Sequence, residues 1–211
     1  MRIEVSKLVD AYLTARETVI SKGYSSEIDW QDTRCLSHLS ESEFLEEAAW
    51  VVLNTGMRES VIKKHFFEIA IAFYNWISAE LIVKNRISCE LSALKVFNCP
   101  SKISAISSIC KTIADMGFLS FREQIQAEGV EFLQTLDFIG PVTKYHLAKN
   151  IGLDVVKPDR HLLRWAKAAN IKYPKNLCQS IADITGDKIS VIDLILWRYA
   201  TLYPDYTDLL H

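Results

Sequence analysis

Glycine and proline are scarce in this chain of 211 residues, which contains seven glycines and five prolines. Together they make up about half of their usual share of a protein. This scarcity disfavours folds built from many strands and tight turns, and it disfavours long disordered segments. With 49% apolar residues, the chain can bury one substantial core or two small ones. We therefore expect a mainly helical protein.

Long apolar runs, cysteine motifs and an excess of basic charge are also lacking. No run approaches the roughly 18 apolar residues of a membrane-spanning helix, and the start of the chain lacks the apolar stretch of a signal peptide. The five cysteines are odd in number and form no C-x-x-C pair, so we expect neither disulfides nor a metal site. The net charge of -2 excludes a uniformly basic surface. These features predict a cytoplasmic protein with no membrane partner.

Apolar residues recur at steps of three and four along most of the chain, which is typical of helices. Breaks at glycine, proline and serine divide the chain into about ten helices. Ser40 and Glu43 match a capping box, and Ser101 is expected to cap a helix that runs to about Met116. Four aromatic residues on apolar helix faces are expected to be core: Trp50, Phe66, Phe67 and Trp76.

A tight turn is predicted at Asp137–Gly140, between a short helix and a longer one that begins at Pro141 and runs to about Ile151. Proline is favoured in the first turn of a helix because its missing N–H group is not needed there. The N–H groups of Val142 and Thr143 would then be free to bind an anion such as a phosphate. By itself the turn fits an ordinary helical hairpin equally well.

The segment 136–164 resembles the helix-hairpin-helix DNA glycosylase superfamily. Leu136, Ile139, Gly140 and Thr143 match its hairpin of the type Leu-Pro-Gly-hydrophobic-Gly. The run Val156 to Arg164 matches the segment in which the family carries its catalytic aspartate, about twenty residues after the hairpin. A weaker likeness covers residues 44–64, which resemble the family's early helix, loop and helix.

The resemblance implies an all-α, two-lobed glycosylase fold with the active-site cleft between the lobes. The central lobe is expected at residues 38–151, including the hairpin, and the second lobe at 1–37 and 152–211. Asp159 would be the catalytic carboxylate, and we expect it to cap the helix that follows it. The implied partner is double-stranded DNA with a damaged or modified base, bound by a monomer, nucleoid-associated in a bacterium. The residues expected to contact DNA are Gly140, Val142, Thr143, Lys144 and Arg160.

No cofactor is required by this resemblance. An iron–sulfur cluster is not expected, because Cys178 is the only cysteine after the hairpin. The resemblance leaves room for a monovalent cation held by carbonyl groups of the hairpin.

Two positions depart from the family pattern. Phe138 stands where the first hairpin glycine is expected, so the turn must follow a different path or do without glycine's freedom at positive φ. Val142 stands where glycosylases with lyase activity carry a lysine, so no amine is present there to form a Schiff base. Lys149 faces the same side as Val142 but lies about 10.5 Å farther along the helix, and Lys144 points roughly 200° away. A monofunctional enzyme is the main interpretation, and a lyase with a displaced lysine is the alternative.

Several residues are candidates for the base pocket. His146 lies one helical turn after Val142, where the resembling alkylpurine glycosylases carry a pocket aromatic residue. In the loop at residues 54–59 the family places the side chain that fills the gap in the DNA; a glutamine is frequent where Gly56 stands, and Met57 or Arg58 could serve instead. Four aromatic residues could stack on an extruded base: Trp197, Tyr199, Trp30 and Tyr24.

Basic charge is concentrated between Val142 and Lys175. This window carries eight basic residues against two acidic ones, so its charge is +6 and that of the remaining chain is -8. Such polarity allows one face to bind DNA despite the acidic total, although a solvated helix face explains it as well.

The function predicted from these features is hydrolysis of the N-glycosidic bond of a flipped base. A lone carboxylate with no acid beside it favours bases that leave easily, so alkylated purines such as 3-methyladenine and 7-methylguanine rank first. Glycosylases for oxidised or bulky modified bases remain alternatives. A DNA-binding protein without enzymatic activity is the alternative from another class.

Overall fold

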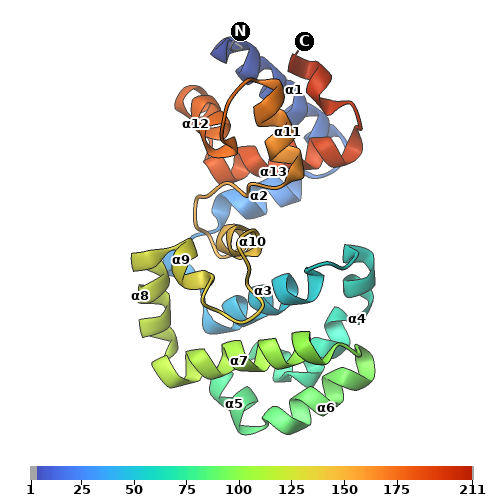
Figure 1. The fold of residues 1–211 in the computed structure, drawn as a ribbon, viewed down its shortest axis with the longest axis vertical. Coiled ribbons are helices and arrows are strands. Elements are labelled where there is room, and N and C mark those ends of the chain that lie inside the picture. Colours follow the sequence, from blue (N-terminus) through green and yellow to red (C-terminus); the bar gives the residue numbers. More distant parts are fainter. Residues whose placement is uncertain (1–3, 211) are drawn as a thin grey trace. The chain divides into compact units, whose positions relative to one another are not determined.

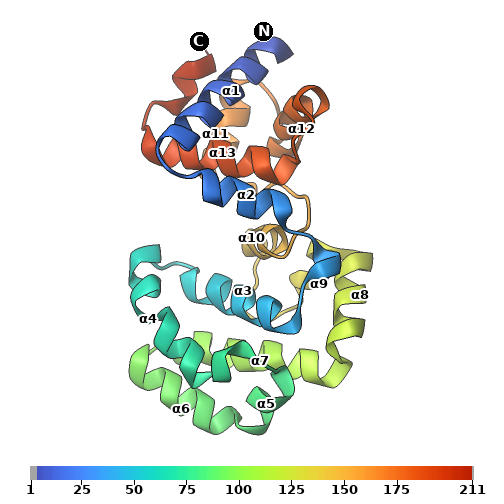
Figure 2. The same cartoon turned by 180° about the vertical axis from the view of Figure 1, so that it is seen from behind.

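The computed structural model describes residues 4–210, and within them the protein is all-α, with no strand. It has thirteen α-helices in that range, more than the ten or so expected, because short helices such as α5 (Ala79–Lys84) were not separated by the sequence pattern. The short helix expected before the turn at Asp137–Gly140 is present as α9 (Val130–Leu133). None of the described helices combines the length and the apolar character that a membrane crossing requires. Figures 1 and 2 show the helices from two opposite sides.

The chain forms two compact units. The terminal unit comprises the described parts of residues 1–34 and 152–211, and the central unit comprises residues 35–151. The boundaries predicted from the sequence lie at 37/38 and 151/152, so the first differs by three residues from the boundary between the units.

The terminal unit is built around α13 (Ile189–Leu202). This helix packs against α1 (Val5–Ser21), α2 (Ser25–Thr33), α11 (Arg160–Ala168) and α12 (Pro174–Thr185), as Figure 2 shows for α1 and α2. A 3-10 turn at Tyr206–Leu210 packs on α1 and α11. Their apolar faces share one core, which includes Tyr12, Trp165, Ile192 and Ile195.

The central unit is organised around α7 (Pro100–Met116), which packs against α3 (Glu41–Asn54), α5, α6 (Arg86–Val96) and α8 (Phe118–Glu128). Helix α4 (Glu59–Ala72) packs on α3 and α6. Helix α10 (Thr143–Asn150) lies against α3 and α9 (Figure 1). Short 3-10 turns at Leu36–His38 and Tyr74–Trp76 complete the unit.

Local signals at the helix starts were right in one case and wrong in another. The capping box at Ser40 and Glu43 is confirmed, with the Ser40 hydroxyl accepting from the Glu43 N–H at 3.2 Å. The cap predicted at Ser101 is wrong, because α7 already starts at Pro100 and no side chain supplies a cap bond there.

The prediction that Phe67 belongs to the core is also wrong, because its side chain on α4 is 72% exposed.

Candidate catalytic carboxylate and anion-binding surfaces

Asp159 is the N-cap of α11, as predicted. Its Oδ1 accepts hydrogen bonds from the backbone N–H groups of His161 (2.9 Å) and Leu162 (3.1 Å). The backbone of Asp159 is extended, as an N-cap residue requires, and Pro158 favours extended backbone at Lys157 before it. Among the described residues no group bonds to Oδ2. The cap therefore fixes the carboxylate through one oxygen and leaves the other available for chemistry.

The segment that leads to Asp159 is anchored at two points on α13. Asp154 Oδ1 accepts from the Ser190 N–H at 2.8 Å, and Asp193 Oδ2 accepts from the Lys157 N–H at 2.5 Å. Asp193 is 2% exposed. Because the second anchor lies two residues before Asp159, it limits where the carboxylate can move.

Sequence reasoning missed both anchors. The available signal was Asp193 itself, a carboxylate on the otherwise apolar face that Ile192, Ile195 and Leu196 form on α13. Charged residues are almost never fully buried without a partner. Such a position therefore indicates a fixed polar contact, although it does not identify the group that supplies it.

A basic stripe runs along the exposed side of α11, starting next to Asp159. Arg160, Arg164 and Lys167 follow one another at steps of four and three and are all exposed, which places them on one face of the helix. The opposite face buries Leu162, Trp165 and Ala166. In the described range none of the three basic side chains has an acidic partner. The stripe is thus free to bind anions.

His161 contacts both Asp159 and the stripe: its backbone N–H donates to Asp159, and its ring accepts from Arg160 Nε. The pKa of His161 is lowered from its ordinary value by burial, and further by the charges of Arg160, Arg164 and Lys157, while Asp159 raises it. The imidazole is therefore neutral at pH 7. Sequence reasoning gave it no role, although it lies inside the segment matched to the aspartate motif.

The shifted pKa of His161 predicts a pH dependence of stability. Its pKa in the unfolded chain is about 6.5, so as pH falls below that value the unfolded state binds more protons than the folded state. The free energy of unfolding of the wild type should thus decline until the pH has passed the folded pKa. His161→Gln removes this contribution, as urea unfolding at pH 7.5 and 5.5 would show. Equal pH dependence in the variant and the wild type contradicts the assignment, and His38→Gln, at an exposed position, is the matched control.

The hairpin in the central unit differs from its prediction at the start of the second helix. Helix α10 begins at Thr143, two residues after Pro141. The Thr143 hydroxyl accepts from the Gly140 N–H at 2.7 Å, and the Tyr145 N–H bonds to the Val142 carbonyl three residues back. The chain between Gly140 and Val142 therefore forms a turn before regular helix begins.

Two N–H groups at this turn are free, as expected. In the described part of the chain neither the Val142 nor the Thr143 N–H meets an acceptor. The Gly140 N–H is occupied by Thr143. Helix α10 thus offers two donors at its start, and the glycine contributes none.

Phe138 takes the conformation that a glycine would take in the resembling family. Its φ is +67°, in the left-handed region, whereas Gly140 has no positive φ. Left-handed backbone costs roughly 1–2 kcal/mol for a residue with a Cβ atom. The amine of Lys102 lies 6.0 Å from the centre of the Phe138 ring. The expectation that the turn would do without a positive φ at this position is therefore wrong, because Phe138 itself adopts one.

Neither Lys144 nor Lys149, the two lysines of α10, extends its amine freely into solvent. Lys144 is buried, and its Nζ pairs with Glu131 Oε1 at 2.8 Å. A phosphate contact by Lys144 would require that ion pair to open. Lys149 is buried as well. Partly buried His146 lies on the same helix, and Asn150 Nδ2 donates to Glu47 Oε2 on α3 at 2.8 Å.

The loop between α3 and α4 has exposed side chains, and its first residues are held in place by hydrogen bonds. Met57 is 42% exposed and Arg58 is exposed, next to Gly56 with φ +70°. The buried amine of Lys102 donates to the carbonyls of Leu53 and Thr55. Burial lowers the pKa of Lys102. Lys102 therefore holds the start of this loop in place, a contact that local sequence does not indicate.

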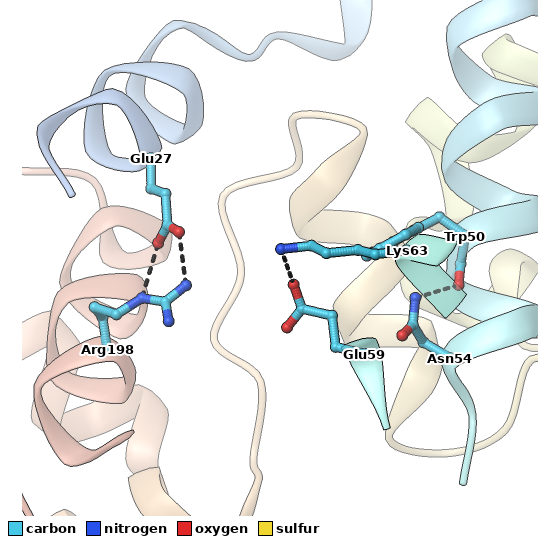
Figure 3. A network of polar contacts seen from close by, with 6 residues as sticks. All are labelled: Glu27, Trp50, Asn54, Glu59, Lys63 and Arg198. Carbon is cyan, nitrogen blue, oxygen red and sulfur yellow. Dashed lines mark hydrogen bonds and ion pairs between the residues drawn. The ribbon is translucent and has the colours of Figure 1, made fainter. Parts of the chain in front are cut away.

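Further local bonds support the same loop. Asn54 Nδ2 donates to the Trp50 carbonyl at 2.9 Å, and Lys63 pairs with Glu59 at 2.7 Å on the first turn of α4 (Figure 3). Thr55 and the hairpin residues 138–143 together line a shallow pocket of about 490 Å³. The structure thus brings the loop and the hairpin together within the central unit, with the two free N–H groups beside the pocket.

The aromatic candidates of the terminal unit are engaged in packing. The guanidinium of Arg198 lies 4.5 Å from the Tyr24 ring centre and 4.7 Å from that of Trp197, and it pairs with Glu27 through two bonds (Figure 3). Tyr199 is buried, and its ring lies 6.4 Å from that of Trp165. The guanidinium carbon of Arg34 lies 4.7 Å from the centre of the Trp30 ring.

Within the described residues no three His, Cys, Asp or Glu side chains cluster as a metal site would require. Comparisons with protein-family models, curated proteins and solved structures found no match for this chain.

Proposed function

We propose that the protein is a monofunctional DNA glycosylase of the helix-hairpin-helix type, with its two-lobed fold, and that Asp159 is the catalytic carboxylate. The observation that carries the proposal is the arrangement at the start of α11. Asp159 is fixed by two backbone bonds through Oδ1, its Oδ2 has no partner among the described residues, and the unpaired basic stripe begins at the next residue. A carboxylate beside cationic side chains suits work on a phosphate-linked sugar.

The chemistry follows from the charge that develops on the sugar. As the bond between C1′ and the base nitrogen breaks, the electron pair leaves with the base and the sugar becomes cationic. A fixed carboxylate about 4 Å away stabilises that charge by about 4 kcal/mol at an effective dielectric constant near 20. Water then attacks C1′, and Asp159 can accept its proton. The products are the free base and an abasic strand.

The three positions on the hairpin helix that were candidates for a lyase amine favour hydrolysis without strand cleavage. Val142 occupies the position of the lyase lysine, Lys144 is paired with Glu131, and Lys149 is buried. A Schiff base requires a lysine amine that is unprotonated and reaches C1′.

The product should therefore be an intact abasic strand that breaks only after alkali or heat. Borohydride added during the reaction should trap no covalent protein–DNA complex. Lys149→Ala serves as a matched variant. A trapped complex that disappears in Lys149→Ala or Lys144→Ala would contradict monofunctional hydrolysis and assign the amine.

Alkylated purines are the proposed substrates. A base that is already cationic needs little help to leave, so one carboxylate suffices for it. His146 on α10 could contact such a base through its ring. The released bases should be measured after incubation with methylated duplex DNA. Release of 3-methyladenine or 7-methylguanine supports the proposal, and activity only on another modified base would overturn the substrate and leave the glycosylase in place.

The rival function is DNA binding without catalysis, and the basic stripe on α11 fits it equally. The same assay separates the two: binding without release of any base, across a panel of alkylated, oxidised and bulky modified duplexes, would favour the rival.

Replacing a basic residue of the stripe should weaken binding to all DNA sequences alike. If Arg160, Arg164 and Lys167 contact phosphates, each change to Ala should lower the slope of log affinity against log salt by roughly one. Titrations at several salt concentrations measure this slope. Lys84→Ala, at an exposed position of the central unit, is the control. An unchanged slope in all three variants would place the DNA surface elsewhere.

A further inference from the structure

The side chains of Arg160 and His161 form a hydrogen bond with each other, although the two residues are consecutive in the chain. The Nε–H of Arg160 donates to Nε2 of His161 at 3.2 Å. Adjacent residues of a helix do not ordinarily face each other, so this bond requires a specific ring orientation. Since Nε2 accepts, it carries no proton, and in the neutral imidazole the proton must lie on Nδ1.

That Nδ1 donor is buried and has no partner in the described part of the protein. The ring of Tyr206 lies 5.7 Å from the His161 ring, centre to centre. Tyr206 is 3% exposed, and its Oη is likewise buried with no partner among residues 4–210. Each unsatisfied buried group costs about 1–3 kcal/mol, and one hydrogen bond between the two, direct or across a water, would satisfy both.

We propose that Tyr206 and His161 are positioning residues for Arg160. The Nδ1–H of His161 donates a hydrogen bond to the Tyr206 hydroxyl, directly or across a water, which keeps Nε2 as an acceptor and holds the guanidinium of Arg160 by its Nε. The two terminal nitrogens of Arg160 are then left to bind one DNA phosphate in bidentate fashion beside Asp159. This assignment of phosphate binding rests on the proposed function, whereas the tautomer of His161 does not.

Tyr206 comes from the last described turn, which packs on α11. The inference therefore gives this C-terminal segment a role beyond filling the core. It also explains why a tyrosine serves at a position where phenylalanine would pack equally well: the ring of Tyr206 already lies 5.3 Å from Trp165, and the hydroxyl adds nothing to that contact.

The test compares Tyr206→Phe with Tyr203→Phe. Tyr203 is the C-cap residue of α13, three residues before Tyr206, and its ring lies 4.8 Å from that of Tyr199. Nitrogen-15 spectra of the His161 ring at pH 7.5 should show the Nδ1–H tautomer in the wild type and in Tyr203→Phe, and a mixture of tautomers in Tyr206→Phe. Affinity for duplex DNA should fall about fivefold in Tyr206→Phe, as expected for one hydrogen bond. Combining this change with Arg160→Ala should cost no more than Arg160→Ala alone.

An Nε2–H tautomer in the wild type would overturn the inference. So would losses of affinity that add fully in the double variant, because then Tyr206 would act independently of Arg160. If the wild type binds no DNA, the proposed function fails, and the ring spectra still decide whether Tyr206 holds His161.

Discussion

Asp159→Asn should lower the rate of base release by roughly a thousandfold, because the charge that stabilises the cationic sugar is worth about 4 kcal/mol. Asparagine is as good an N-cap as aspartate, so the bonds to His161 and Leu162 should persist and the fold should be retained. Duplex binding should stay within a few fold, since no phosphate contact is removed. Single-turnover release of the base, with binding measured separately, checks both parts.

The matched control is Asp154→Asn. Asp154 is an aspartate of the same segment that also bonds to a backbone N–H of a helix, at Ser190, and asparagine can keep that bond. Asp154→Asn removes one negative charge, as Asp159→Asn does, but leaves the proposed reacting oxygen in place. The rate of base release should therefore remain near that of the wild type. Equal losses in the two variants, or full activity of Asp159→Asn, would refute Asp159 as the catalytic carboxylate.

Local signals predicted the features of the candidate site that depend on short stretches of chain. The period of apolar residues indicated helices, and the Pro158–Asp159 pair indicated both a break and an N-cap, because these effects act within one turn. The free N–H groups of Val142 and Thr143 follow from the same local logic, even though regular helix starts two residues later than predicted.

Contacts between distant residues could not be predicted in this way. The sequence predicted a DNA contact for Lys144, yet tertiary packing pairs it with Glu131, thirteen residues away. Lys102 is close in sequence to none of the groups it holds, since Leu53 lies 49 residues before it. The backbone of Phe138 was missed for a different reason: an unfavourable conformation is retained there because the turn is bonded at Gly140 and Thr143, which residue preference alone does not indicate.

Removal of the second anchor of the Asp159 segment, by Asp193→Ala, should impair base release without touching a reacting group. The Lys157 N–H would lose a buried, charged acceptor, which costs about 2 kcal/mol of unfolding free energy. Release should fall by about a hundredfold, since a shift of about 1 Å in a catalytic group has effects of that size. Single-turnover rates, at a temperature where circular dichroism shows the variant folded, separate misplacement from unfolding.

Asp193→Asn is the matched variant, because its amide oxygen can still accept from Lys157. It should retain most of the rate that Asp193→Ala loses. A stability loss in Asp193→Ala together with a wild-type rate would mean that the contact between α13 and Lys157 supports the fold alone. The cap bonds of Asp159 to α11 would then be sufficient to position its carboxylate, without the contact to α13.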